Sequence, residues 1–441
     1  MFLGIDIGTT SIKALVVQEE GKIMDSFSRP LQVFSPDSLS REQDPQHWQE
    51  AVLALLHQVS ERHEIVSIGL AGQMHSLVLL DDRDRPLRPS ILWCDQRTTE
   101  ECRKLTEKLG GESEVIRRVG NPFFEGFTLP KIQWVKTHEP ENYRNACSIL
   151  LPKDYIGFLL TGEKGTDPSD ASGTGAFCVN AEKWDDELLT LCEIAPSLFP
   201  KVTPSDSLRG FLRKDLSERF GWEKVRVITG GADNPVAALG AGVDDPGLGM
   251  ISLGTSGTVV VSTKSEVPDP TGRVHYFHHA LPRIRYYMGV MLSATHSLDW
   301  FLSRFGKKDS WSEFETAIGN SVAGSRGLLF LPYLNGERTP HRDPDARGVL
   351  FGISSTHTEG EAYRCILEGI AYGLRDSYEL IKALTPIKRL RVVGGGAKNR
   401  TWVRIIASNL STPLELLETD QGAAYGAAML AANGSGLSKE E

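Results

Sequence analysis

A short pattern that occurs twice constrains this chain more than any other feature. In each copy an apolar strand ends near a glycine, hydroxyl side chains follow, and a second apolar segment begins. The two copies are residues 4–13, GIDIGTTSIK, and residues 250–261, MISLGTSGTVVV. Similar strand-turn-strand units in the two halves of one chain predict two similar domains that face each other.

The first copy is typical of a turn that binds phosphate. Residues 2–7 are short and apolar, which predicts a buried strand, and Gly8 lets the backbone turn sharply. Backbone N–H groups in such a turn converge on an anion, Thr9 and Thr10 add hydroxyl donors, and Lys13 adds positive charge. An ordinary turn closed by side-chain hydrogen bonds explains this stretch alone equally well.

A carboxylate distinguishes the first copy from the second. Asp6 stands where the second copy has Ser252, while Gly254, Thr255 and Ser256 repeat the glycine and hydroxyls. A carboxylate repels phosphate unless a cation lies between them, and Mg²⁺ binds through one or two carboxylates plus phosphate oxygens. The pair of turns therefore favours a polyphosphate held from both sides, with Asp6 directed at the metal.

Composition and charge narrow the classes of partner. With 441 residues, 40% of them hydrophobic, the chain can form a large core in two or three domains. The net charge of −9 and the lack of a basic run argue against nucleic acid or a membrane surface. The six cysteines include no CxxC pair, which argues against a zinc site or a disulfide framework. No apolar run approaches the ~20 residues that span a bilayer, so we expect a cytoplasmic protein.

The order of predicted elements indicates the fold class. Residues 14–18 and 23–27 continue as strands, Asp44-Pro45 opens a helix with one apolar face, and residues 65–70 form the next buried strand. Three strands, a helix and a strand begin a ribonuclease-H-like domain of the actin and sugar-kinase type. We therefore expect an α/β protein with two such domains and a cleft between them.

The domain boundary is predicted where glycines and other helix breakers gather. Residues 240–249 are GAGVDDPGLG, immediately before the second copy of the repeated pattern. Such a stretch is typical of a linker. The expected domains are residues 1–240 and residues 247–441.

Polar side chains follow the strand at residues 65–70. Gln73, Met74 and His75 stand at its end, where α/β proteins bind their ligands. Gln73 and His75 suit hydrogen bonds to the hydroxyls of a small polar substrate, and Met74 suits packing against its carbons. A lone histidine is more often structural, so this alternative stays open from the residues alone.

Two later strand ends suggest chemistry and nucleotide binding. Residues 225–229 lead into GGADNP, where Asp233 is placed to accept a proton from a sugar hydroxyl during phosphoryl transfer. A helix N-cap is the alternative role for Asp233, and the two are compatible. Residues 389–393 lead into GGGAKN, whose glycines let a flat ring or a ribose approach the backbone. The candidates for nucleoside binding there are Gly395, Gly396, Ala397 and Asn399.

In their order along the chain, these segments resemble the FGGY carbohydrate kinases, and most closely the bacterial enzymes that phosphorylate D-xylulose. The resemblance covers essentially the whole chain. The matching strings are GIDIGTTSIK, GLAGQMH, LWCDQR, GFTLPK, LLPKDY, SDASGT, GGADN, ISLGTSG, LPYLNGERTPH, LEGIAY and VVGGGAKN. Many are short, but their joint order is highly specific.

The resemblance implies ATP-dependent phosphorylation of D-xylulose to D-xylulose 5-phosphate. It implies that Asp233 accepts the proton and that Asp6 supports Mg²⁺ and the transferring phosphate. It further implies that Met74, His75 and Asn234 contact the ketose. The two turns would hold the ATP phosphates, and the glycine-rich turn would hold the adenosine.

Other functions remain open at this stage. Within the same class the substrate could be ribulose, gluconate, another ketose or a glycerol-like polyol. From other classes, the chain could be an ATP-driven switch, against which its sugar-facing loops speak, or a sugar-binding regulator without catalysis, against which Asp6 and Asp233 speak. Family members usually continue past residue 431 with a further helical segment, whereas this chain stops at Glu441. Assembly is therefore left open, with a homodimer as one option.

Overall fold

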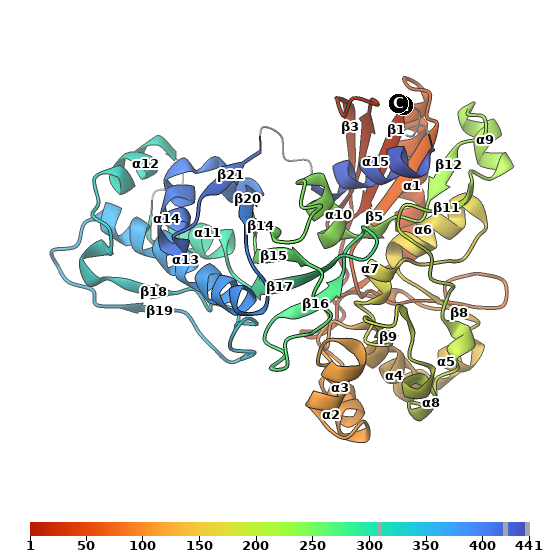
Figure 1. Ribbon diagram of the computed structural model, residues 1–441, viewed down its shortest axis with the longest axis horizontal. Coiled ribbons are helices and arrows are strands. Elements are labelled where there is room, and N and C mark those ends of the chain that lie inside the picture. The colour runs from red at the N-terminus through yellow and green to blue at the C-terminus, as the bar shows by residue number, and fades with distance from the viewer. Residues whose placement is uncertain (307–310, 418–421, 437–441) are drawn as a thin grey trace.

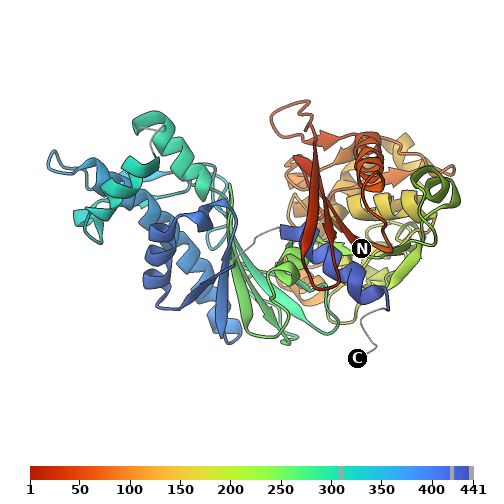
Figure 2. The same cartoon turned by 90° about the horizontal axis from the view of Figure 1, so that it is seen from above.

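Two lobes, each built on one mixed sheet, make up the computed structural model, which describes residues 1–306, 311–417 and 422–436 (Figures 1 and 2). The N-terminal half of the chain forms one lobe, and most of the C-terminal half forms the other. The predicted α/β class with two sheet-based domains is confirmed. The division into residues 1–240 and 247–441 stays a prediction, and residues 437–441 lie outside the described part of the chain.

The first sheet has the order β11-β12-β5-β1-β2-β3, with β13 paired to the end of β5. Strands β1, β2 and β3 are antiparallel neighbours, and β5 and β12 continue the sheet parallel to β1. The strands are β1 (Phe2–Ile7), β2 (Ser11–Val17), β3 (Ile23–Pro30), β5 (Ser67–Gly72), β11 (Leu208–Phe211), β12 (Arg226–Ile228) and β13 (Gly231–Ala232). The strand predicted at residues 65–70 therefore begins and ends two residues later.

The second sheet repeats this plan. Its order is β16-β17-β15-β14-β20-β21, and β17, β15 and β14 are antiparallel neighbours while β20 and β21 run parallel to β14. The strands are β14 (Leu248–Leu253), β15 (Gly257–Thr263), β16 (His275–His278), β17 (Arg285–Met291), β20 (Arg389–Val393) and β21 (Leu414–Leu416). The two copies of the sequence pattern thus form the equivalent β1–β2 and β14–β15 turns.

Helix α1 (Pro45–Ser60) covers one face of the first sheet together with α6 (Pro152–Thr161). As predicted, the Asp44 side chain caps α1 by accepting a hydrogen bond from the backbone of Gln46. The other helices of this lobe are α2 (Thr99–Lys108), α3 (Glu112–Val119), α4 (Thr128–His138), α5 (Pro140–Asn145), α7 (Pro168–Ala171), α8 (Asp186–Leu191), α9 (Lys214–Phe220) and α10 (Asp233–Gly240).

Short strand pairs and helices α2 to α5 and α8 form a separate layer below the first sheet in Figure 1. A core of its own holds this layer together, centred on apolar side chains of α2, α3, α4 and α8. The strand pairs outside the two large sheets are β4 (Glu42–Gln43) with β7 (Ser90–Ile91), β6 (Val78–Leu80) with β8 (Ser148–Leu150), β9 (Phe177–Cys178) with β10 (Lys183–Trp184), and β18 (Leu329–Leu331) with β19 (Val349–Phe351).

The long helix α13 (Glu359–Leu384) packs on the second sheet, with α14 (Arg400–Leu410) beside it. The other helices of this lobe are α11 (Thr295–Phe305) and α12 (Trp311–Gly319). In the described part of the chain no helix combines the length and apolar character that crossing a membrane requires. All six cysteines are free thiols.

The last helix, α15 (Gly422–Gly434), returns to the first lobe and packs on β1, β5 and α10 (Figures 1 and 2). Glycines allow this approach because a Cβ on Gly4 or Gly69 would lie 1.9 Å from a carbonyl oxygen of α15. A Cβ on Gly426 would lie 1.9 Å from the carbonyl oxygen of Val236 in α10.

Candidate active site

The carboxyl ends of β1, β5 and β13 lie side by side at one edge of the first sheet. Asp6 of β1 pairs with Ala71 of β5, and Ala71 pairs on its other side with Gly231 of β13. Asp233 follows two residues later, as the first residue of α10. Because parallel strands end at the same edge, the two aspartates that the sequence singles out are brought together.

Burial raises the pKa values of both carboxyls, and repulsion by Asp6 raises that of Asp233 further. The pKa of Asp233 rises to about 7, mainly through burial and then through the negative charge of Asp6. The pKa of Asp6 rises to about 6 through burial, partly offset by Lys13 on the neighbouring strand. Asp233 does not cap α10, since Ala232 is the N-cap. Its Oδ1 accepts hydrogen bonds from the backbone and side-chain amides of Asn234, at 2.8 and 3.1 Å.

The surroundings of Asp6 fit a divalent cation. Its Oδ1 is buried and accepts no hydrogen bond from the described residues. A buried carboxylate oxygen without a donor is costly unless a cation pairs with it. The described residues contain no cluster of three or more metal-binding side chains. Mg²⁺ requires no such cluster, because phosphate oxygens and water supply most of its ligands.

The first glycine turn presents Thr10 to solvent and leaves Thr9 half-buried. The Thr9 hydroxyl accepts a hydrogen bond from Trp93 Nε1 at 2.9 Å and donates one to Gln73 Oε1 at 3.3 Å. Thr10 is exposed and lies at the turn itself. Of the two threonines, Thr10 is the one whose hydroxyl can reach a ligand directly.

Gln73 is more buried than its position at a strand end suggests. Its side chain is 1% exposed and donates to Gln43 Oε1 at 3.2 Å. Its Oε1 accepts hydrogen bonds from Thr9 and from Ser76, and Gln43 also donates to the Thr9 carbonyl at 2.7 Å. In this structure Gln73 supports the first glycine turn, so its predicted contact with a substrate stays a prediction.

Met74, His75 and Asn234 lie next to one another. The Asn234 side-chain amide contacts Met74 Sδ at 3.8 Å, and the Tyr286 hydroxyl contacts the same sulfur at 3.9 Å. His75 has a positive φ of 66°, which few side chains adopt, and its ring stacks on Phe127 with centroids 4.7 Å apart. The structure thus brings these three predicted substrate contacts together beside Asp233.

His75 is held in one neutral tautomer. Its Nδ1 lies 2.5 Å from the Gly173 carbonyl oxygen, and a carbonyl can only accept, so Nδ1 donates. Burial, together with the charge of Lys131, lowers the pKa of His75 to about 3. A neutral ring that donates through Nδ1 keeps the lone pair on Nε2. His75 can therefore accept a hydrogen bond from a substrate hydroxyl.

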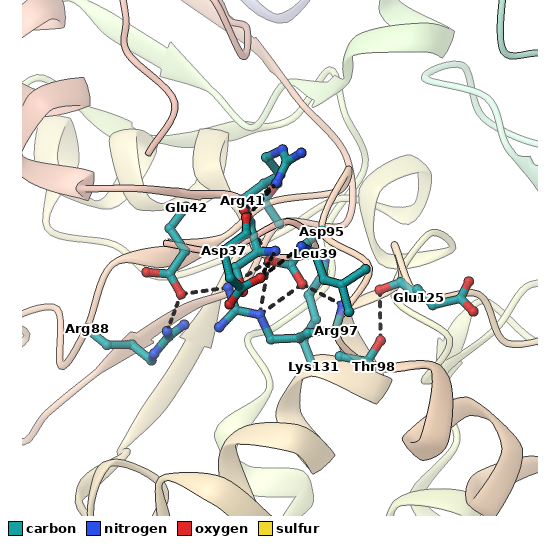
Figure 3. Close-up of polar contacts among 12 residues, drawn as sticks. Asp37, Leu39, Arg41, Glu42, Arg88, Asp95, Arg97, Thr98, Glu125 and Lys131 are labelled. Carbon is teal, nitrogen blue, oxygen red and sulfur yellow. Dashed lines mark hydrogen bonds and ion pairs between the residues drawn. The ribbon is translucent and has the colours of Figure 1, made fainter. Parts of the chain in front are cut away.

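Asp95, Arg97 and Glu42 form a network of charged side chains (Figure 3). Asp95 accepts three hydrogen bonds from the Arg97 side chain and one from the Arg41 backbone at 2.6 Å, and Arg97 also pairs with Glu42 at 2.8 Å. Lys131 lies beside this network and donates to the carbonyls of His75 and Gly126, at 3.0 and 2.5 Å. Lys131 and Thr128 thus both hold the backbone carbonyl of His75 by hydrogen bonds.

A second buried network supports Asp233. Ser169 Oγ accepts a hydrogen bond from the Ala232 backbone at 2.9 Å and donates to Asp167 Oδ2 at 2.5 Å. Lys153 pairs with Asp167 at 3.0 Å and with Asp170 at 3.2 Å, and all these side chains are fully buried. The backbone just before Asp233 is therefore anchored by a chain of charge-assisted hydrogen bonds.

In the second lobe, three segments meet at the end of β14. Thr255 is exposed at the second glycine turn, next to Gly254 and Ser256. The first residues of α11 donate backbone hydrogen bonds to this turn, from Ala294 to Thr255 and from Thr295 to Gly254, at 2.9 and 3.0 Å. The sequence analysis missed the start of α11, because no glycine or cap motif marks it.

The glycine-rich turn after β20 lies against the same place. A Cβ on Gly396 would lie 2.7 Å from the Leu253 side chain, whereas a Cβ on Gly395 would meet nothing within 4 Å. Asn399 caps α14 by accepting from the Trp402 backbone at 2.9 Å, and its buried Nδ2 donates to no described residue. Of the predicted nucleoside contacts, Gly395 leaves space for a ligand and Asn399 keeps a donor for one. Ala397 lies between them in a short 3₁₀ helix.

Sequence reasoning also missed His275 and Arg338. His275 lies in β16 and Arg338 in the loop 332–348, both in the second half of the chain. The charge of Arg338 lowers the pKa of His75 and also the pKa of His275, and His75 lowers the pKa of His275 as well. Both His275 and Arg338 therefore lie near the His75 ring. The available signal was the polar string LPYLNGERTPH, which predicts a functional loop without indicating its role.

Comparisons with known proteins agree with this arrangement. The FGGY family of carbohydrate kinases matches with its N-terminal domain at residues 1–240 and with its C-terminal domain at residues 249–434. A xylulose kinase from Staphylococcus xylosus is 39% identical over 98% of this chain and 90% of that protein. The structure of a xylulose kinase from Rhodospirillum rubrum is 29% identical with a TM-score of 0.93, covering 100% of this chain and 91% of that one. The structure of a gluconate kinase from Lactobacillus acidophilus is 26% identical with a TM-score of 0.94, covering 99% of this chain and 90% of that one.

Proposed function

Since the chain belongs to the FGGY family of carbohydrate kinases, which use ATP, we propose that it phosphorylates D-xylulose at the terminal hydroxyl to give D-xylulose 5-phosphate. The observation that carries the chemistry is the placement of Asp233 beside Asp6 at one sheet edge. A carboxyl with a pKa near 7 is well matched to general-base catalysis at neutral pH. The curated xylulose kinases of similar length support this choice of sugar.

In the proposed reaction the sugar hydroxyl oxygen attacks the γ-phosphorus of ATP while Asp233 accepts the hydroxyl proton. The bond between the γ-phosphorus and the β,γ-bridging oxygen breaks, and ADP leaves. Asn234 holds the Asp233 carboxylate by its two hydrogen bonds, which fixes the direction of the lone pair. Met74 packs against the sugar carbons, and His75 Nε2 accepts a hydrogen bond from a sugar hydroxyl. Gln73 stays a proposed substrate contact, and it also supports the first glycine turn through its hydrogen bonds.

We assign the ATP phosphates to the two glycine turns and the metal to Asp6. Gly8, Thr9, Thr10 and Lys13 would serve one side of the polyphosphate, and Gly254, Thr255 and Ser256 the other. Mg²⁺ bound at Asp6 would neutralise phosphate charge that the carboxylate otherwise repels. The metal assignment is supported by the buried Oδ1 of Asp6, which accepts no hydrogen bond from the described residues. The adenosine is assigned to the turn of Gly395, Gly396, Ala397 and Asn399.

A coupled assay of ADP release tests the proposed function. We expect turnover to depend on sugar, with D-xylulose as the best substrate in a panel that includes ribulose, gluconate and glycerol. Asp233→Asn should lower kcat by about 10³-fold or more, because both the base and its charge are lost, while ADP binding by calorimetry stays within threefold. Equal ATP hydrolysis without any sugar would refute a sugar kinase, and a clear preference for gluconate would refute the choice of D-xylulose.

We further propose a cytoplasmic location and a homodimer. The location follows from the use of ATP, which is a cytoplasmic metabolite. The homodimer is supported by one exposed apolar face of the β18–β19 pair, where Leu329 stands opposite Phe351 and Leu331 opposite Val349. Light scattering coupled to size-exclusion chromatography tests the assembly. A monomer at all protein concentrations would refute the dimer.

A further inference from the structure

A cation without a partner lies at the aromatic part of the site. Among the described residues no group hydrogen-bonds to the Arg338 guanidinium or forms an ion pair with it, and the contact found for it is with Phe124, whose ring centroid is 5.8 Å away. Burial lowers the pKa of Arg338, which Glu125 and Glu337 partly offset. Arg338 is half-buried, and its guanidinium, which has five donors and no acceptor, can bind a ligand that supplies the acceptor.

A histidine beside Arg338 also lacks a partner. His275 is 4% exposed, and its Nδ1 makes no hydrogen bond to any described residue. Its ring stacks on Phe277 with centroids 5.3 Å apart and meets the edge of Phe124 at 5.0 Å. Burial and the charge of Arg338 keep His275 neutral by lowering its pKa. A buried polar atom without a partner, next to an unpaired cation, points to a ligand.

Arg338 and His275 belong to a row of neighbouring side chains that begins at Asp233. Asn234 contacts Met74, and the ring of His75 packs against Phe127 and Phe277. His275 and Phe124 follow, and Arg338 lies over Phe124. A sugar whose terminal hydroxyl is at Asp233 would therefore extend along this row toward Arg338.

We infer that Arg338, His275 and His75 form a subsite for the C1–C2 end of a ketose, an inference that rests on the proposed function. The carbonyl oxygen at C2 only accepts hydrogen bonds, and the guanidinium of Arg338 only donates them. The C1 hydroxyl pairs with His275, whose neutral ring can accept or donate. His75 Nε2 accepts from a hydroxyl nearer to Asp233.

The charges around Arg338 favour a neutral ketose over a sugar acid. Glu125 and Glu337 lie close enough to raise the pKa of Arg338, so its positive charge is already partly compensated. A sugar carboxylate would add negative charge next to Glu125 and next to Glu337, whose own pKa burial raises to about 7, whereas a carbonyl adds none. The subsite thus selects for a carbonyl next to a terminal hydroxyl.

Arg342 provides a matched control. Its guanidinium also lies over the Phe124 ring, at 5.5 Å, but it forms two hydrogen bonds of 2.7 Å with Glu112. Arg342 is therefore neutralised within the protein and has little to offer a sugar. Comparing Arg338→Met with Arg342→Met separates loss of the unpaired donor from loss of a cation over the same ring.

The test measures steady-state kinetics with D-xylulose, 1-deoxy-D-xylulose and xylitol, which lacks the carbonyl. Arg338→Met should raise the KM for D-xylulose about 10- to 100-fold, as expected for a lost hydrogen bond to a charged group, with the KM for ATP within twofold. The preference of the wild type for D-xylulose over xylitol should shrink by the same factor. Arg342→Met should change the KM for D-xylulose less than threefold.

A second variant addresses the C1 hydroxyl. His275→Phe keeps the stacking on Phe277 and removes both nitrogens, so it should raise the KM for D-xylulose about fivefold and leave that for 1-deoxy-D-xylulose unchanged. Thermal unfolding verifies that each variant is folded. An unchanged preference for D-xylulose over xylitol in folded Arg338→Met overturns the subsite while leaving the kinase assignment intact. A wild type that phosphorylates none of the three sugars overturns the proposed function, and the subsite with it.

Discussion

The ionisation of Asp233 determines how the rate should respond to pH. Its pKa is raised to about 7, and it accepts a proton only when ionised, so kcat/KM for the sugar should fall about tenfold per pH unit below 7. In Asp6→Asn the residual activity should persist to lower pH, because the charge that raises the Asp233 pKa is gone. Profiles between pH 5 and 9 at saturating ATP measure both effects. An acidic limb near pH 4 in the wild type would contradict this role for Asp233.

The same carboxyl should weaken the folded state at neutral pH. Since its pKa is raised on folding from 3.8 to about 7, the folded state binds a proton more tightly than the unfolded one, and stability is lost as pH rises from about 4 to 7. Asn cannot ionise, so Asp233→Asn should raise the Tm at pH 8 by roughly 2–5 °C and by much less at pH 4. Thermal unfolding at the two pH values measures the difference.

Asp81 offers a control of opposite sign. Hydrogen bonds from the Arg85 backbone and side chain lower the pKa of Asp81 to about 2, so its contribution to stability is present above pH 4 and is lost as pH falls through 2. Asp81→Asn should therefore lower the Tm at pH 8, where Asp233→Asn raises it. If Asp233→Asn lowers the Tm at pH 8 as Asp81→Asn does, the raised pKa of Asp233 is wrong.

At the scale of elements, the crossing of α10 and α15 should tolerate no side chain at Gly426. A Cβ there would lie 1.9 Å from the Val236 carbonyl oxygen, so the two helices must separate. Gly426→Ala should lower the free energy of unfolding by about 3 kcal/mol, the upper part of the range for overpacking. Urea unfolding measures this. Gly319→Ala, where a Cβ meets nothing within 4 Å, should change it by less than about 0.5 kcal/mol.

Strand ends explain how much of the site the sequence could predict. Asp6 lies near the end of the apolar strand β1, and Asp233 directly follows β13. Parallel strands end at a shared sheet edge, so the proximity of the two aspartates follows from local pattern. Gln73 has the same local signature, yet a side chain from a distant segment, Gln43, buries it. No local pattern reveals that partner.

For Arg338 and His275, the local sequence did not indicate that they belong to the site. Each belongs to an irregular loop or a strand of the second half of the chain, and neither has a periodic pattern that indicates which way it faces. Their importance arises only because β16 lies against the elements that carry His75 and Phe124. Contacts of this kind depend on how the two lobes pack, which a single sequence does not specify.

At the scale of the whole molecule, the two halves of the proposed nucleotide site lie on different lobes. The first glycine turn joins β1 and β2, whereas the second turn and the turn at Gly395 belong to the second sheet. The chain passes between the lobes near α10 and returns as α15, and these two helices pack on each other. A ligand that contacts both turns should therefore draw the lobes together, while one that contacts a single lobe should not.

Small-angle X-ray scattering tests this prediction. ATP analogues with a non-hydrolysable γ-phosphate, given with magnesium, should reduce the radius of gyration by about 1 Å or more, because the phosphates bridge the two turns. Adenosine should bind the second lobe alone and leave the radius unchanged. Thr10→Ala with Thr255→Ala should reduce the compaction, since these exposed hydroxyls lie at the two turns. Equal compaction by adenosine and by the ATP analogue would show that the phosphates do not bridge the lobes, which would contradict the paired-turn site.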